Sequence, residues 1–295
     1  MAVSISKDFR ACVYSAYDNL VACVVVDGPH ITATHRSYAI HGLTESPEQL
    51  QNLCWCILGF LDEVNEIDFK LQSVIGVGEQ VARNLKQDLE TYFDIGETLS
   101  EGSKSKATKR NALLAEIIAH VLVHIHRRKG LFSDWVGDAV GCRNPHLSVN
   151  DGGLDLIALG YINKNYFSVI GEVKAYENDP LRGFSEACKK FTDVRQGIYN
   201  RELRGALSRL SSEQGLTRDD LAKNIWKTIS NFGAFVCFDD GVFFDIARSS
   251  NREEVKKQPP ERLFLLVTPY TEMEKLFDKI SDQLLAIASS FEGQE

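Results

Sequence analysis

The 295-residue chain carries 33 Lys and Arg against 41 Asp and Glu, and its formal net charge is −8. With 44% hydrophobic and 25% charged residues it has the composition of an ordinary globular protein, which argues against a disordered chain. No apolar run approaches about 18 residues, the start lacks the pattern of a signal peptide, and the seven cysteines mostly have apolar neighbours, so we expect a cytoplasmic protein without a disulfide framework.

The charge is divided unevenly along the chain. Residues 1–104 contain 7 Lys and Arg against 15 Asp and Glu, whereas residues 105–295 contain 26 of each. An acidic surface repels a phosphate backbone, so nucleic acid affinity is not expected from the first part. We predict an acidic N-terminal α+β region over 1–104, for partner docking or regulation, and a second domain over 105–295, with the polar segment 96–108 at the boundary.

Several elements are predicted in the N-terminal region. Residues 10–16 and 19–26 are short apolar runs that predict strands, and Asp27-Gly28-Pro29 predicts a turn after them. Ser46-Pro47-Glu48 predicts the start of a helix that continues to about Leu61. Residues 71–77 predict a further strand, followed by a helix over 79–93.

The second domain is predicted to open with a long helix over 109–126. Its broad apolar face comprises Leu113, Leu114, Ile117, Ile118, Val121, Leu122 and Ile125. Glu116 lies within this apolar register. Residues 131–147, which include Trp135, predict a loop.

Residues 154–161 and 166–174 predict a hairpin with a turn at Asn163-Lys164. For a two-residue loop the numbers of paired residues have a constant sum, which places Asp155 opposite Glu172, with Lys174 on the same face. Directly opposed residues have Cβ atoms about 5 Å apart, so the two carboxylates are unfavourable unless something neutralises them, for which a divalent cation such as Mg²⁺ is the candidate. A one-residue slip in register, or a metal-free salt-bridged cluster, is the alternative.

The pattern of residues after 174 predicts further helices and strands that extend this core. A helix is expected over 181–200, strands over 234–238 and 263–268, and a closing helix over 272–289. Lys189 and Lys190 on the first of these helices could approach a nucleic acid backbone, or could form a solvated charged face.

Asp155 followed by Glu172-Val173-Lys174 on the next strand resembles the Asp…Glu-x-Lys core of the PD-(D/E)XK nuclease superfamily. Two segments resemble the sequences of the nuclease subunits (HamA) of Hachiman anti-phage systems. They are Gly-Leu-Asp-Leu-Ile-Ala at 153–158 and Gly-Glu-Val-Lys-Ala-Tyr at 171–176. Two departures stand out: Gly153-Leu154 replaces the superfamily's proline, and the segment 196–199 is one residue shorter than a Gln-x-x-x-Tyr motif.

The resemblance implies an α/β fold, with a mixed sheet flanked by helices in a restriction-endonuclease-like core. It implies that Asp155, Glu172 and Lys174 are catalytic, that Mg²⁺ or Mn²⁺ is held by Asp155, Glu172, the Val173 carbonyl and Glu116, and that Gln196 supports the site. It further implies that DNA is the substrate and that a HamB-like helicase subunit is the partner. A restriction or repair nuclease working alone, and a nuclease-like assembly module without activity, are the alternatives.

Overall fold

The computed structural model describes residues 2–61, 89, 104–143, 153–217 and 230–292. In these residues the elements are, in chain order, α1 (Ala2–Cys23), β1 (Val25–Ile31), β2 (Arg36–His41), α2 (Pro47–Leu61), α5 (Lys104–Lys129), α6 (Ser133–Val136), β3 (Asp138–Cys142), β4 (Leu156–Ile162), β5 (Asn165–Ala175), α7 (Pro180–Arg195), α8 (Asn200–Glu213), β6 (Asn231–Asp239), α10 (Ile246–Ser249), α11 (Glu253–Lys256), the 3₁₀ helix η2 (Pro260–Arg262), β7 (Leu263–Tyr270) and α12 (Met273–Glu292).

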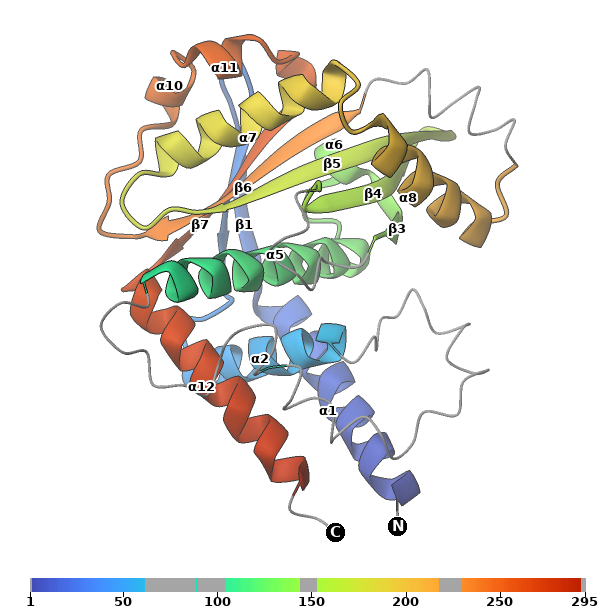
Figure 1. Ribbon diagram of the computed structural model, residues 1–295, viewed down its shortest axis with the longest axis vertical. Coiled ribbons are helices and arrows are strands. Elements are labelled where there is room, and N and C mark those ends of the chain that lie inside the picture. The colour runs from blue at the N-terminus through green and yellow to red at the C-terminus, as the bar shows by residue number, and fades with distance from the viewer. Residues whose placement is uncertain (1, 62–88, 90–103, 144–152, 218–229, 293–295) are drawn as a thin grey trace.

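The fold is α/β, as predicted, and is built on one mixed sheet flanked by helices. In the described residues the sheet has seven strands in the order β1-β2-β7-β6-β5-β4-β3. The central strands β2, β7, β6 and β5 are parallel, whereas β1 and the meander β5-β4-β3 pair antiparallel. The predicted strands 234–238 and 263–268 lie within β6 and β7. Figure 1 shows α5 along one face of this sheet and α7 and α8 on the other.

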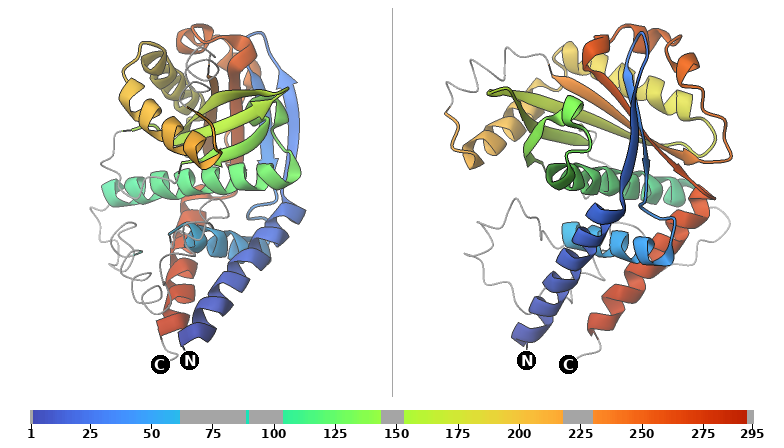
Figure 2. Two further views of the ribbon diagram at one scale, coloured as in Figure 1. Left: turned by 90° about the vertical axis from the view of Figure 1, so that its right-hand side faces the viewer. Right: turned by 180° about the vertical axis from the view of Figure 1, so that it is seen from behind.

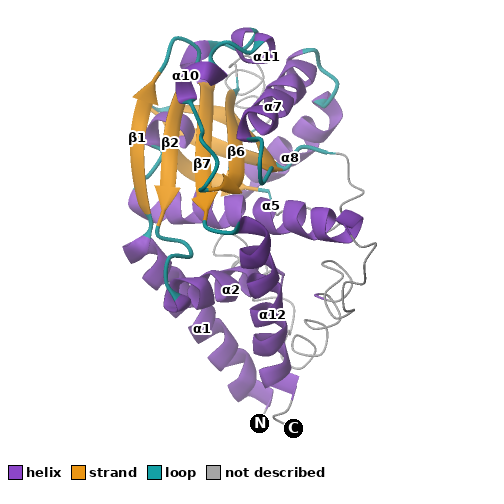
Figure 3. Ribbon diagram, turned by 90° about the vertical axis from the view of Figure 1, so that its left-hand side faces the viewer, coloured by secondary structure: helices purple, strands orange, loops and turns teal. Residues whose placement is uncertain are grey.

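Side chains alternate between two hydrophobic clusters, one on each face. On β5, Val169 and Val173 join the cluster that contains α5, whereas Ile170 joins the cluster that contains α7. The helices α1, α2 and α12 pack on the far side of α5, and the described part of the chain begins with α1 and ends with α12 (Figures 2 and 3). Because α5 lies between the sheet and these helices, it is buried almost all round from Leu113 to Ile125.

The predicted strands over 10–16 and 19–26 are wrong, because this segment is the helix α1. Its buried residues recur every three or four positions and pack against α2; they are Phe9, Val13, Ala16, Tyr17 and Leu20. The turn predicted at 27–29 is also wrong. These residues lie inside β1, where the pairing with β2 shifts register between Asp27 and His30.

The helix predicted to begin at Ser46 is confirmed as α2. The Ser46 hydroxyl accepts a hydrogen bond from the Gln49 backbone N–H (3.1 Å), and the Gln49 side chain accepts one from the Ser46 N–H (2.9 Å). This reciprocal pair is a capping box, which satisfies backbone donors that a helix start leaves open. The closing helix is likewise confirmed as α12.

The predicted loop over 131–147 is wrong in its described part, which forms α6 and β3 around the fully buried Trp135. The helix predicted over 109–126 is confirmed, and it is longer: α5 begins at Lys104, so the end of the predicted boundary segment is helical. The elements predicted over 71–77 and 79–93 lie outside the described residues, Leu89 excepted.

The described part of the N-terminal region shares one sheet with the rest of the chain. The strand β2 pairs in parallel with β7, which lies more than two hundred residues later in the sequence. A docking or regulatory role for residues 1–104 stays a prediction. No helix in the described ranges is both long and apolar enough to cross a bilayer.

Candidate active site

The hairpin register predicted from the turn is confirmed. Pairing runs from Ile162 opposite Asn165 to Leu156 opposite Gly171, and continuing this register one residue past the paired stretch would bring Asp155 opposite Glu172. The central turn residues, Asn163 and Lys164, have φ angles of 50° and 67°. Two positive φ angles are typical of the type I′ turn, whose twist matches that of the strands it joins.

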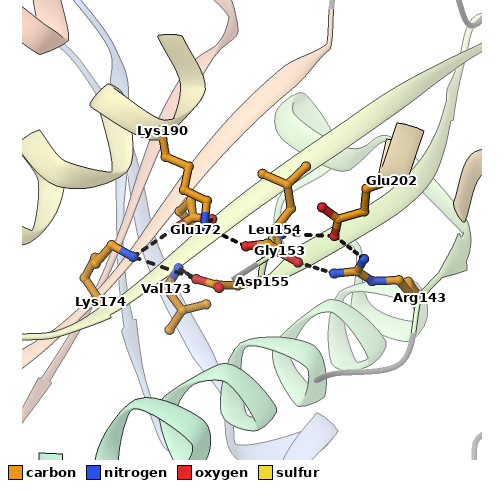
Figure 4. A network of polar contacts seen from close by, with 9 residues as sticks. All are labelled: Arg143, Gly153, Leu154, Asp155, Glu172, Val173, Lys174, Lys190 and Glu202. Carbon is orange, nitrogen blue, oxygen red and sulfur yellow. Dashed lines mark hydrogen bonds and ion pairs between the residues drawn. The ribbon is translucent and has the colours of Figure 1, made fainter. Parts of the chain in front are cut away.

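The structure brings Asp155, Glu172 and Lys174 together (Figure 4). The Lys174 Nζ lies 2.8 Å from Glu172 Oε2 and 3.9 Å from Asp155 Oδ2. Asp155 Oδ2 also accepts a hydrogen bond from the Val173 N–H at 2.7 Å. The lysine ammonium therefore bridges the two carboxylates.

These residues meet where β5 extends beyond the first residue of its neighbour β4. The strand β5 continues to Ala175, but β4 begins only at Leu156, so the last residues of β5 face the chain around Asp155 in place of a paired strand. The N–H and C=O groups of one residue project from the same edge of a strand. The Val173 carbonyl therefore projects from the edge on which its N–H bonds Asp155.

Helix α5 closes this edge with two residues one turn apart. The His120 Nε2 lies 3.1 Å from the Asp155 carbonyl oxygen, so the imidazole donates to the backbone of the candidate ligand. Glu116 lies four residues earlier on the same helix face and is buried. Its negative charge contributes to raising the pKa of Asp155, so Glu116 lies within electrostatic reach of that carboxylate, and its role at a metal stays a prediction.

Burial and neighbouring carboxylates disfavour the ionised forms of Asp155 and Glu172. Burial, and then the charge of Asp155, raise the pKa of Glu172 to about 7, although Lys174 and Lys190 oppose this rise. Burial is also the main cause that raises the pKa of Asp155. Burial disfavours the charged form of Lys174, but Glu172 and Asp155 outweigh that effect and raise its pKa.

The donor set fits a hard divalent cation. Mg²⁺ and Mn²⁺ prefer oxygen ligands and are often held by one or two carboxylates, with water and phosphate completing the shell. Glu172 is fully buried; its Oε1 accepts no hydrogen bond from the described residues, but the Lys190 ammonium lies 3.3 Å from it. The described ranges contain no group of three or more His, Cys, Asp or Glu arranged for a metal, so a cation at this site would have few protein ligands.

The structure does not place Gln196 beside Asp155, Glu172 and Lys174. It lies exposed at the C-terminal end of α7, where its backbone N–H bonds the Thr192 carbonyl. Its side chain makes no hydrogen bond to the trio among the described residues, and its supporting role stays a prediction. Lys190, from the same helix, reaches the site instead.

Lys190 is a site residue that the sequence analysis did not identify. Its Nζ lies 3.3 Å from Glu172 Oε1 and 5.3 Å from the centre of the Tyr199 ring. The spacing of apolar residues along α7 indicates that Lys190 lies near the sheet. Ala187 and Phe191 face the sheet, and Lys190 lies three residues after the first and one before the second, at the margin of that buried face.

No protein-family model matches the chain, and no curated protein or solved structure matches it significantly.

Proposed function

We propose that the protein is a metal-dependent nuclease that hydrolyses phosphodiester bonds, with Asp155, Glu172 and Lys174 as its catalytic residues. The observation that carries the proposal is the meeting of the fully buried Glu172 carboxylate, the partly buried Asp155 carboxylate and a lysine at one hairpin edge. Buried ionisable groups are costly, and such clusters concentrate at functional sites. The PD-(D/E)XK resemblance of the same three residues supplies the reaction class.

The arrangement of elements supports a restriction-endonuclease-like core. The helix α5 precedes the antiparallel meander β3-β4-β5, and α7 then leads to β6, which pairs in parallel with β5. The candidate carboxylates lie on the hairpin of this unit, and Glu116 comes from the preceding helix, as the resemblance implies.

In this proposal Asp155, Glu172 and the Val173 carbonyl hold Mg²⁺ or Mn²⁺, with Glu116 as a further or indirect ligand. When bound, the cation would lower the pKa of a water molecule and stabilise negative charge on the phosphate. Lys174 keeps its proton beside the carboxylates and offsets the negative charge of the transition state. Lys190 holds the Glu172 carboxylate in place from α7.

DNA is the proposed substrate, and a HamB-like helicase is the proposed partner, both on the Hachiman resemblance. The balanced charge of residues 105–295 gives little general attraction to a phosphate backbone, which favours delivery of DNA by a partner. The helices α1, α2 and α12 lie across α5 from the hairpin (Figure 2). A partner bound there leaves the hairpin edge open.

Degradation of single- and double-stranded DNA and of RNA tests the proposal, with Mg²⁺ or Mn²⁺ and with or without the helicase. Asp155→Asn, Glu172→Gln and Lys174→Met are each expected to lower the rate by about 100-fold or more. Lys164→Met, at the exposed hairpin turn, is the matched lysine control. Equal rates in the wild type and all three site variants would remove the mechanism, and cutting without any partner would favour a nuclease that works alone.

A further inference from the structure

The backbone of Leu154, next to Asp155, is held by an ion pair from two other elements. The Leu154 N–H donates to Glu202 Oε1 at 3.0 Å, and Arg143 Nη2 donates to the Leu154 carbonyl oxygen (Figure 4). Arg143 Nη1 also donates to the same Glu202 oxygen at 2.5 Å. One arginine and one glutamate thus satisfy both backbone groups of a single residue.

The neighbouring backbone carbonyls are held in the same way. Lys190 Nζ donates to the Gly153 carbonyl oxygen at 2.6 Å, and His120 approaches that of Asp155. Backbone groups in a buried segment need partners, and the pairing of β4 ends at Leu156. Side chains from three helices, and that of Arg143 just after β3, therefore replace the missing strand pairing around the candidate metal ligand.

The ion pair is placed to hold the Leu154 backbone in position, and this is a more specific role than general stabilisation of the fold. Arg143 directly follows β3, and Glu202 lies in the first turn of α8; their side chains are 21% and 25% exposed. At this exposure, solvent partly screens the attraction between the two side chains. Their hydrogen bonds to Leu154, however, fix the chain one residue before Asp155, and the Leu154 side chain is fully buried.

We propose that Arg143 and Glu202 are positioning residues that clamp Leu154 and so place the Asp155 carboxylate for the cation. This inference rests on the proposed metal-dependent function. It assigns the effect to the two bonds with the Leu154 backbone and not to the attraction between the side chains. Partners that orient metal ligands typically change metal affinity by about 10–100-fold when they are lost.

The test uses the full chain and two readouts, which are the binding of Mn²⁺ alone and the amide hydrogen exchange of Leu154. Glu202→Ala is expected to weaken Mn²⁺ binding by about 10–100-fold and to speed exchange at Leu154. Glu202→Gln, which keeps an acceptor for the Leu154 N–H, gives a smaller effect and guards against misfolding. Glu213→Ala is the control, because Glu213 pairs with Arg209 on the exposed side of the same helix.

The double variant Arg143→Glu/Glu202→Arg separates a clamp from a structural ion pair. It restores opposite charges, but a glutamate at 143 cannot donate to the Leu154 carbonyl and an arginine at 202 cannot accept from its N–H. We expect it to bind Mn²⁺ as weakly as Glu202→Ala does. Recovery of wild-type affinity in the double variant would overturn the clamp, and so would unchanged affinity and exchange in Glu202→Ala.

Failure of the proposed function gives a different result. If the wild-type chain binds no Mn²⁺, the metal-dependent function is refuted, and with it the purpose of the clamp. Exchange at Leu154 then still reports on the clamp itself, because it requires no metal.

Discussion

Lys190 on α7 and Glu172 on β5 form a second ion pair within the site, with 3.3 Å between Nζ and Oε1. Lys174 binds the other oxygen of the same carboxylate. Burial and the charge of Asp155 raise the pKa of Glu172, and the two ammonium groups hold that rise to about 7. The protonated and ionised forms of this carboxylate are therefore close in free energy at neutral pH.

Lys190→Met is expected to shift metal binding to higher pH. Loss of this ammonium lets the pKa of Glu172 rise further, and a proton competes with the cation for the carboxylate. Mn²⁺ titrations between about pH 6 and about pH 9 measure the shift. Lys189→Met is the control, because Lys189 is the exposed neighbour on the same helix. Identical pH profiles for the two variants would contradict the role of Lys190.

The sequence was sufficient for the part of the site that depends on local pairing. A two-residue turn fixes the hairpin register, and the register alone places Asp155 opposite Glu172. Lys190, Arg143 and Glu202 could not be placed in this way. They come from helices and a strand end whose docking depends on the packing of the whole domain.

The errors in the fold have the same origin. The segment of α1 contains valines and tyrosines, which favour strands in isolation, but burial against α2 makes it a helix. The pairing of β2 with β7 joins residues far apart in sequence, which no local pattern specifies. The helix α5 was predicted well because its apolar face is long and periodic.

Lys164→Gly is expected to stabilise the fold by up to about 1 kcal/mol. Lys164 has a φ of 67°, in the left-handed region where a Cβ is unfavourable, and glycine is preferred at this position of a type I′ turn. Lys164→Ala keeps the Cβ and is expected to give no such gain. Urea unfolding of the three proteins measures the difference. Equal stability of the glycine and alanine variants would show that the turn is not strained.

His124→Phe is expected to remove part of the destabilisation by acid. His124 is buried, with ring centres 6.5 Å from Tyr17 and 5.0 Å from Phe60. Burial, and then the charge of Arg127, lower its pKa from 6.5 to about 4. The unfolded chain takes up a proton near pH 6.5 and the folded chain only near pH 4. The free energy of unfolding therefore falls across this window as pH is lowered, by about 3 kcal/mol from this group.

Unfolding by urea at several pH values across that window measures the effect. The variant is expected to gain stability relative to the wild type as pH falls, because phenylalanine takes up no proton in either state. His41→Phe, at the exposed end of β2, is the control. If the His124 and His41 variants respond to pH alike, burial of His124 is not the cause of the acid sensitivity.

Gly233→Ala and Gly205→Ala are expected to change stability in opposite directions. A Cβ at Gly233 on β6 lies 2.3 Å from Cζ2 of the buried Trp135, so alanine forces the indole to move and costs about 1–3 kcal/mol. A Cβ at Gly205, inside α8, meets nothing within 4 Å, and alanine there gains about 0.5–1 kcal/mol of helix propensity. Urea unfolding measures both.

Trp135→Phe tests whether the indole is the obstacle. Phenylalanine is smaller, so the double variant Trp135→Phe/Gly233→Ala is expected to be more stable than the sum of the two single effects predicts. Strictly additive stabilities would mean that the contact with Trp135 does not limit residue 233.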